Sequence, residues 1–378
     1  MKGTPGSNGR GRFLERLAKK TAGFLLAKIS SPRHRHWHGL EAAGPIKKII
    51  VIRQHNQFGD VLCTVPLLRA LRSKFSPDEL AVVVSPQNID AITGCKHVTS
   101  LINYDKLTFY RKPALFFTFV RNLRKDYDLL LVPSNVSISL TNDLLAFLVK
   151  ARTKIGPRSL ESKPNKTSSV YDIAVDLRWE KSIAHQSFRN MKVAEPLGIT
   201  RSDSSGQLEY EVDKKTLDEV AAFIVRASGK SGRRVALHAG AGKLPNRWNV
   251  VHFARLSDLL HNELDAEIFL TEGPMDHDVI EHLINIIKVP FIRVRNKTVS
   301  FIAGLLKEMD MVVTNDTGIM HLSAAVGTPT LSLFGPTDPL QWAPLGSKHR
   351  FILGRGGDIN TIEVTKAFSS ASKLLRKS

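Results

Sequence analysis

A carboxylate that could act as a general base follows the first predicted strand. Residues 49–53 form an apolar, β-rich run, a polar loop follows, and Asp60 stands where a helix is expected to begin. Ligands of open α/β sheets bind beside the carboxyl ends of the strands, which would place this carboxylate in the ligand crevice. There Asp60 could take a proton from a substrate hydroxyl. A structural alternative stays open, because Asp is also a common N-cap that binds backbone amides.

A second loop has the composition of an anion site. Gly240 and Ala241 follow the strand expected at residues 234–238, and such small residues let backbone N–H groups approach an anion. Arg247 adds a planar fork of donors that suits phosphate. The segment is not a Walker loop, because it lacks the terminal Gly-Lys-Ser/Thr. A plain glycine-rich turn is the alternative, and Trp248 is expected to pack in the core.

The most informative stretch is residues 312–329. A strand runs into Asp316, Thr317 and Gly318 at a predicted helix N-terminus, where free N–H groups and the helix dipole favour a diphosphate. Thr317 can donate a hydroxyl hydrogen bond there, and His321 lies one helical turn later on the same face. Asp316 would repel a diphosphate unless it binds a hydroxyl or caps backbone groups. The alternative is a capped helix whose histidine makes only internal contacts.

Metal sites and cofactors are not expected. Asp126 and Asp128, and likewise Asp276 and Asp278, have the Asp-x-Asp spacing that can hold a metal-bound diphosphate. The first pair precedes a predicted strand rather than following one. The second pair opens a predicted helix, where acidic residues stabilise the helix dipole. We therefore predict that neither pair binds a metal.

The elements that would position these residues alternate along the chain, in two series separated by a polar segment at 201–209. The first series has strands at 49–53, 80–84, 129–132, 154–155 and 173–175 and helices at 61–75 and 140–149. The second has strands at 234–238, 267–270, 291–294, 311–314 and 330–334 and helices at 250–264, 276–287, 299–308, 319–326 and 362–375. Repeated βα units give parallel sheets covered by helices on both faces. The predicted fold class is α/β, with two facing Rossmann-like, doubly wound domains.

The predicted division is a basic segment at 1–46, a first domain at 47–205 and a second at 206–378. A chain of 378 residues is long enough for two domains of ordinary size. Segment 1–46 holds nine Lys or Arg residues and two acidic ones. Within it, residues 12–29 predict a basic amphipathic helix, which could lie on an anionic membrane surface or pack on its own domain.

Composition narrows the class of protein. A hydrophobic share of 42% is typical of globular proteins, and a net charge of +19 favours a polyanionic partner. No apolar run approaches the roughly 20 residues needed to cross a bilayer, and no secretory signal is evident. These features, together with the presence of only two cysteines, predict a cytoplasmic protein that could be peripheral on the inner membrane face. Nucleic acid is not expected as a partner, since no recognition motif accompanies the basic residues.

Together these motifs resemble glycosyltransferase family 9, whose best-known members are ADP-heptose:lipopolysaccharide heptosyltransferases. The resemblance covers residues 47–375. It is carried by Phe58-Gly59-Asp60 ahead of Pro66, Arg247-Trp248, Thr271-Glu272-Gly273-Pro274, and residues 315–318 through His321 to 334–337. The sequence departs from the family pattern at Asn249, where Pro is usual, and it lacks the Cys-bearing C-terminal segment of many relatives.

The resemblance implies a GT-B fold, in which the N-terminal domain binds the acceptor and the C-terminal domain binds the nucleotide sugar. It implies inverting transfer of a sugar, with heptose from ADP-heptose expected first, onto a lipopolysaccharide core or related bacterial surface glycan. The position of Asp60 matches the base that deprotonates the acceptor hydroxyl. The positions that match donor-binding residues are Gly240, Ala241, Arg247, Asp316, Thr317, Gly318 and His321. Asp276 is a weaker match to a nucleoside ribose contact.

Two other functions are compatible with these features. Nucleotide-sugar epimerases and hydrolases also use paired Rossmann-like domains, but they would consume the donor with no acceptor present. A non-catalytic basic binding protein could retain the same scaffold, and it would show no thermal stabilisation by a sugar nucleotide.

Overall fold

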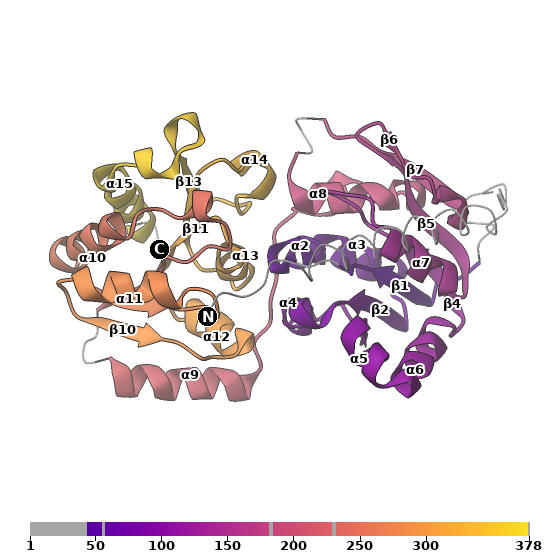
Figure 1. Cartoon of the computed structure of the whole chain (residues 1–378), viewed down its shortest axis with the longest axis horizontal. Coiled ribbons are helices and arrows are strands. Elements are labelled where there is room, and N and C mark those ends of the chain that lie inside the picture. The colour runs from indigo at the N-terminus through magenta and orange to yellow at the C-terminus, as the bar shows by residue number, and fades with distance from the viewer. Residues whose placement is uncertain (1–43, 55–56, 181–183, 229–231, 377–378) are drawn as a thin grey trace, which may run out of the picture.

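The protein consists of two α/β halves that lie side by side, each built on its own sheet (Figure 1). The structure is a computed structural model that describes residues 44–54, 57–180, 184–228 and 232–376. We call the half that contains strands β1–β7 the first half, and the half that contains β8–β13 the second half.

The sheet of the first half has the order β3-β2-β1-β4-β5-β6, with β7 paired to β5. All its pairs are parallel except that of β5 with β6. The strands are β1 (Lys48–Ile52), β2 (Glu79–Val84), β3 (Ser100–Asn103), β4 (Tyr127–Leu131), β5 (Ala151–Leu160), β6 (Lys163–Pro164) and β7 (Ile173–Leu177). The central strands β1, β2 and β4 are almost wholly buried, as expected for apolar runs covered by helices on both faces.

The helices of the first half cover this sheet. They are α2 (Phe58–Leu62), α3 (Val65–Phe75), α4 (Asp90–Thr93), α5 (Lys106–Arg111), α6 (Pro113–Leu123), α7 (Leu140–Leu148) and α8 (Gln186–Met191). The single helix predicted at 61–75 is wrong in one respect, because it is interrupted at Cys63 and Thr64. Pro66 explains the break: it has no N–H to continue the helical hydrogen bonds, and it is tolerated in the first turn of α3.

The sheet of the second half is wholly parallel and has the order β10-β9-β8-β11-β12-β13. Its strands are β8 (Arg233–His238), β9 (Ala266–Thr271), β10 (Phe291–Val294), β11 (Met311–Asn315), β12 (Thr330–Phe334) and β13 (His349–Leu353). This is the strand order of a dinucleotide-binding Rossmann fold, and the first half shares its core order. The predicted fold class is confirmed.

Helices cover both faces of the second sheet. They are α9 (Lys214–Ala227), α10 (Val250–Leu264), α11 (His277–Ile286), α12 (Val299–Lys307), α13 (Gly318–Ala325), α14 (Pro339–Trp342) and α15 (Val364–Leu375). Successive residues of β8 enter different hydrophobic clusters: Val235 and Leu237 pack toward α10 and α15, whereas Ala236 belongs to the cluster that contains α12. This alternation is the two-residue period of a strand buried on both sides.

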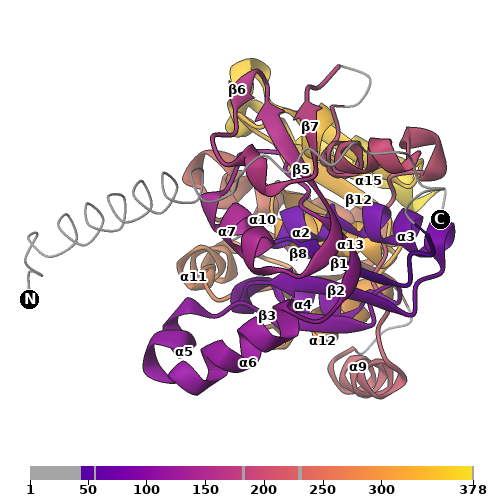
Figure 2. The same ribbon diagram turned by 90° about the vertical axis from the view of Figure 1, so that its right-hand side faces the viewer.

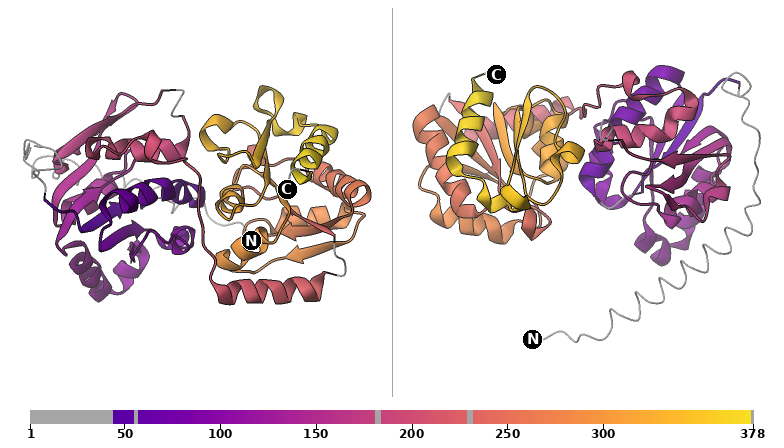
Figure 3. Two further views of the ribbon diagram at one scale, coloured as in Figure 1. Left: turned by 180° about the vertical axis from the view of Figure 1, so that it is seen from behind. Right: turned by 90° about the horizontal axis from the view of Figure 1, so that it is seen from above.

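The two halves share hydrophobic contacts. One cluster of buried residues runs from Ile92 and Leu62 in the first half to Leu322 and Phe301 in the second. Helices α2 and α13 pack against each other across the junction. Figures 1 and 3 show that the segment from α8 to α9 runs along this junction, and residues 204–213 within it contain no helix or strand.

Candidate active site

A cavity of about 660 Å³ lies between the two halves. Its walls are formed by the segments that follow β1 and β2 in the first half and β8, β9, β10, β11 and β12 in the second. Both strand orders reverse direction here, between β1 and β4 and between β8 and β11. Doubly wound folds bind their ligands at such switch points. The charged residues that line the cavity are Asp60, Glu272, Asp276, Asp316, Lys243 and Lys297.

Asp60 reaches the cavity from α2 in the first half. Its residue surface is only 1% exposed. Asn135 donates Nδ2 to its Oδ1 at 3.3 Å, and Nη2 of Arg53 lies 3.6 Å from the same oxygen. The N-cap alternative is excluded, because Gln57 occupies the N-cap and Asp60 lies inside the helix.

Arg53 and Asn135 contact the predicted base, and neither was among the predicted site residues. Arg53 donates Nε to Thr64 Oγ1 at 3.0 Å and Nη2 to Asn135 Oδ1 at 2.9 Å. Burial lowers the pKa of Arg53, and the attraction of Asp60 opposes that shift. The guanidinium therefore offsets the buried carboxylate charge and orients it. In the sequence, Arg53 is recognisable as a charged residue at the end of an apolar strand. Asn135 lies 75 residues from Asp60, and no local motif marks it.

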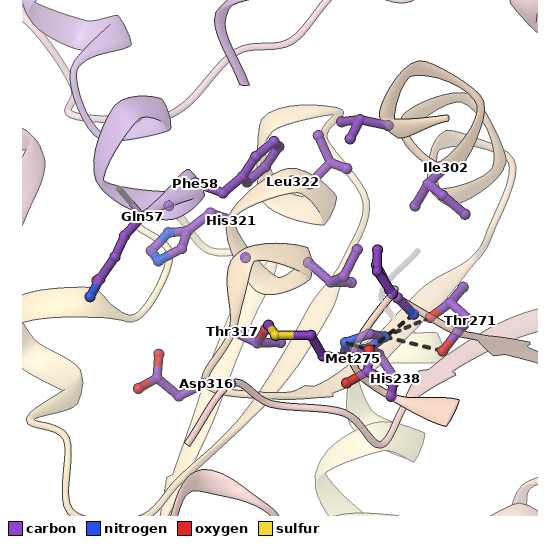
Figure 4. A pocket seen from close by; sticks show the side chains of 18 of the residues that line it. Gln57, Phe58, His238, Thr271, Met275, Ile302, Asp316, Thr317, His321 and Leu322 are labelled. Carbon is purple, nitrogen blue, oxygen red and sulfur yellow. Dashed lines mark hydrogen bonds and ion pairs between the residues drawn. The ribbon is translucent and has the colours of Figure 1, made fainter. Parts of the chain in front are cut away.

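The N-terminus of α13 faces the cavity from the second half. Thr317 is its N-cap, with extended backbone (φ −156°, ψ 175°), and its side chain makes no capping hydrogen bond. Both Thr317 and Gly318 line the cavity (Figure 4 labels Thr317). The amide N–H groups of the first turn and the helix dipole thus create a position suited to an anion.

Asp316 lies beside this helix end and is held by Asn246, which donates Nδ2 to its Oδ2 at 3.0 Å. Burial raises the pKa of Asp316, while the hydrogen bond from Thr337 and the charge of Lys243 lower it. A carboxylate in this setting is better suited to accept a hydroxyl hydrogen bond than to face a diphosphate directly.

Asn315 belongs to the motif at 315–318 but was not among the predicted site residues. It is fully buried at the end of β11. Its Nδ2 donates to the carbonyls of Ala239 and Gly240, and its Oδ1 accepts from the amide of Trp248. One side chain thereby ties the loop after β8 to the strand that leads into α13.

His321 lines the cavity and contacts both halves, since its ring also meets that of Trp342 in the second half at 6.0 Å. Figure 4 shows it beside Gln57 and Phe58. A Cβ added to Gly59 would overlap its ring, and its Nδ1 lies 4.0 Å from Cys63 Sγ. Burial, and secondarily the nearby His185, lowers the pKa of His321 to about 3. The imidazole is therefore neutral near pH 7 and contributes no positive charge to the cavity in this structure.

Asp276 lies in the cavity at the N-cap of α11. Its Oδ2 accepts from the amide of Gly273 at 2.9 Å and lies 3.6 Å from His238 Nε2. Burial lowers the pKa of His238 and the charge of Asp276 opposes the shift. The loop after β8 passes close to this carboxyl group, because a Cβ at Gly240 would overlap it.

The remaining predicted donor residues support the cavity from behind. Gly240, Ala241 and Arg247 are not among the described residues that line it. Arg247 donates Nε to the carbonyl of Ala241 at 2.7 Å, so its guanidinium braces the loop in this structure. Among the described residues, the Lys and Arg side chains that line the cavity are Lys243 and Lys297, and neither was a predicted site residue. Trp248 is buried in the core, as predicted.

Comparison with known proteins decides the family. The family model for glycosyltransferase family 9 (heptosyltransferase) matches residues 116–370, which is more than half of the chain. The chain belongs to glycosyltransferase family 9. It is similar to lipopolysaccharide heptosyltransferase 3 of Escherichia coli, with 25% identity over 312 residues that cover 76% of this chain and 83% of that protein.

Solved structures have the same fold as this family 9 chain. A glycosyltransferase of family 9 from Veillonella parvula superposes with a TM-score of 0.78 at 19% identity, covering 88% of this chain and 98% of the other. E. coli heptosyltransferase WaaC with ADP superposes with a TM-score of 0.69 at 18% identity, covering 86% and 99%. The family 9 assignment and the predicted glycosyltransferase activity are confirmed, and neither the epimerase nor the binding-protein alternative is favoured.

Other predictions for this family 9 enzyme concern metals and membranes. Across the described residues, no group of three or more His, Cys, Asp or Glu side chains is arranged to hold a metal ion. Asp128 instead accepts from the amides of Lys47 and Lys48. No helix in the described ranges is both long and apolar enough to span a bilayer. The basic helix predicted at 12–29 lies outside the described residues.

Proposed function

We propose that this enzyme transfers heptose from ADP-heptose to a lipopolysaccharide core or a related surface glycan, with inversion at the anomeric carbon. The observation that carries the proposal is that Asp60 of the first half and the N-terminus of α13 in the second half line one cavity. Relatives named as lipopolysaccharide heptosyltransferases, and a WaaC structure that contains ADP, support the choice of donor and acceptor class.

The proposed reaction is a single displacement. The acceptor hydroxyl gives its proton to the Asp60 carboxylate while its oxygen forms a bond to the anomeric carbon. The bond from that carbon to the diphosphate oxygen breaks, and ADP leaves with the electron pair. Thr317, the amides of Gly318 and the first turn of α13, and Lys243 stabilise the charge that develops on the diphosphate.

The two halves divide the substrates in this proposal. The first half, proposed as residues 47–205, binds the acceptor near Asp60, and the second half, 206–378, binds the donor. Asp276 contacts the nucleoside, and Asp316 accepts a hydrogen bond from a sugar or ribose hydroxyl. His321 forms part of the wall on the donor-binding side. Gly240, Ala241 and Arg247 hold the loop that approaches the phosphates. The reaction is proposed to occur at the cytoplasmic face of the membrane.

A screen of nucleotide sugars tests the proposal. A true donor stabilises the folded state by about 2.7 kcal/mol when present at 100 times its Kd, which raises Tm by several degrees. ADP-heptose is expected to exceed ADP-glucose, UDP-glucose and UDP-N-acetylglucosamine in this assay. Product analysis with a lipopolysaccharide-core acceptor should show one inverted glycosidic linkage. Donor consumption that needs no acceptor would instead support the epimerase or hydrolase class.

A further inference from the structure

Helix α6 of the first half presents an exposed apolar surface that the active site does not use. Leu115, Phe116 and Phe117 are consecutive, and they are 43%, 40% and 71% exposed. Single exposed apolar residues are ordinary, but three large ones on a single turn indicate an interaction surface. Figure 2 shows α5 and α6 projecting from the first half, away from the second-half helix α9.

A rigid aromatic base supports this surface. The ring of Phe116 meets that of Phe109 edge-on, with centroids 5.7 Å apart. Phe109 packs at 4.9 Å on Phe119, which is buried and also contacts Tyr104 at 5.5 Å. The exposed rings therefore extend an aromatic cluster that begins in the core. Because this packing already restricts their rotamers, inserting the rings into a partner surface costs little further conformational entropy.

The same segment carries a concentrated positive charge. Residues 106–125 contain six basic residues and no acidic one. All six are exposed: Lys106, Arg111, Lys112, Arg121, Arg124 and Lys125. Exposed aromatic and apolar side chains in a segment rich in Lys and Arg are typical of surfaces that bind anionic lipid. The aromatic rings enter the headgroup boundary, and the cations meet the phosphates.

We propose that α5 and α6 dock the enzyme on an anionic phospholipid bilayer. We call the docking surface the α6 patch, which comprises Leu115, Phe116, Phe117 and these six basic residues. The occupant is inferred from charge complementarity combined with an exposed apolar wedge, since a purely electrostatic partner would not require exposed phenylalanines. The α6 patch is distinct from residues 12–29, and docking does not depend on which sugar is transferred.

A fluorescent label beside the wedge reports directly on insertion. Thr118 is exposed and adjacent to Phe117, whereas the native cysteines Cys63 and Cys95 are buried. An environment-sensitive dye on full-length Thr118→Cys should shift to the blue when vesicles with 30% phosphatidylglycerol are added, and should not respond to phosphatidylcholine vesicles. The same dye on Ala222→Cys, an exposed position on α9, should not shift. Vesicle binding with an unshifted label at position 118 would overturn the proposal.

Substitutions in the patch test its contribution to affinity. Phe116→Ser/Phe117→Ser should weaken binding to the anionic vesicles about tenfold or more, and Arg121→Glu/Arg124→Glu roughly fivefold or more per residue. The matched controls lie on α9: Val225→Ser, which is 78% exposed, and Lys214→Glu/Lys215→Glu should leave binding within about twofold. Arg121→Glu/Arg124→Glu and the α9 controls should keep the wild-type Tm, because the changed residues are exposed. Phe116→Ser also removes the contact with Phe109, so circular dichroism at the assay temperature must show that Phe116→Ser/Phe117→Ser is folded.

Two outcomes would contradict docking on lipid. Equal vesicle binding by the patch variants and the α9 controls would show that another surface carries the affinity. A wild-type dimer that becomes monomeric in Phe116→Ser/Phe117→Ser, without loss of vesicle binding, would show that a second copy covers the patch. Neither measurement requires sugar transfer, so failure here leaves the proposed function standing, and failure of the donor screen leaves docking standing.

Discussion

The Asp60 carboxylate is buried, and its orientation is set by partners from other segments. Arg53 compensates its charge, and Asn135 donates to the same Oδ1 that faces the guanidinium. A buried carboxylate without such compensation would carry a large desolvation penalty. The same contacts that make an ionised Asp60 tolerable also hold it at the cavity wall, where a base must be placed.

Replacing Asp60 with Asn should remove the proton acceptor while preserving size. We expect kcat to fall about 10²- to 10⁴-fold, because that is the range contributed by a positioned general base. Donor Kd, measured by calorimetry, should change little, since the donor is proposed to bind the second half. Asp126→Asn, which makes the same change at an exposed position, should keep full turnover. Near-normal turnover by Asp60→Asn would refute its role as the base.

Replacing Asn315 with Ala should loosen the donor side. The change removes hydrogen bonds to Ala239, Gly240 and Trp248 and leaves buried backbone groups unpaired. We expect the free energy of unfolding to fall by about 1–3 kcal/mol and donor KM to rise. Urea unfolding and steady-state kinetics measure the two effects. Asn360→Ala is the control, because Asn360 is exposed and its Oδ1 accepts from the amide of Asn249. An equal loss in both variants would show that Asn315 has no special positioning role.

At the scale of elements, two short helices bring the halves together. Gly59 of α2 lies against the ring of His321, and a Cβ on Gly318 of α13 would come within 3.2 Å of Phe58. Glycine at both positions permits this close approach. The approach sets the distance between Asp60, one residue after Gly59, and the anion position at the N-terminus of α13.

Gly59→Ala tests this contact. The added methyl group would overlap the His321 ring, so α2 and α13 must separate and Asp60 must shift. We expect kcat/KM to fall more than about tenfold, since small displacements of reacting groups are costly, while the far-ultraviolet circular dichroism stays that of the folded protein. Ser73→Ala is the control, because Ser73 is an exposed helical position on α3 that does not line the cavity. Full activity with a raised Tm in Gly59→Ala would mean that helix propensity alone governs this site.

At the scale of the whole molecule, neutral histidines lie at the junction of the halves. His185 of the first half contacts the carbonyl of Ala343 in the second through Nε2 at 3.1 Å, and burial lowers its pKa to about 4. Burial lowers the pKa of His321 to about 3. Both side chains would be protonated in the unfolded chain below their ordinary pKa of about 6.5 but stay neutral in the folded protein.

The enzyme should therefore lose stability as the pH falls below 6.5. In that window the unfolded state binds more protons than the folded state, so the free energy of unfolding decreases with decreasing pH. Each of the two histidines contributes roughly 2 kcal/mol between pH 6.5 and 5. Urea unfolding at pH 7 and pH 5 measures the loss. His321→Gln should reduce it, whereas His282→Gln at an exposed position should not, and identical losses in both variants would contradict this account.

Much of this architecture follows from local sequence. The strands at 291–294 and 330–334 and the helix at 250–264 were predicted with the bounds that the structure has. A short apolar run between two helical segments predicts a buried parallel strand, whichever strands later pair with it. The same alternation of strands and helices predicts that Asp60 and Thr317 follow the carboxyl ends of strands. In a doubly wound sheet, ligands bind beside these ends, at the switch point. Edge strands β3 and β13 were missed, because they are partly exposed and mix polar with apolar residues.

Tertiary structure alone decided which groups meet. Asn135 reaches Asp60 across 75 residues, and Asn315 joins loops 67 to 76 residues away. Arg247, a predicted phosphate ligand, turns to its own loop, while Lys243 and Lys297 line the cavity. Local pattern determines whether a segment is strand or helix, because hydrogen bonding and burial repeat along the chain. The direction of a long side chain depends instead on its neighbours in space, which no local pattern of the sequence encodes.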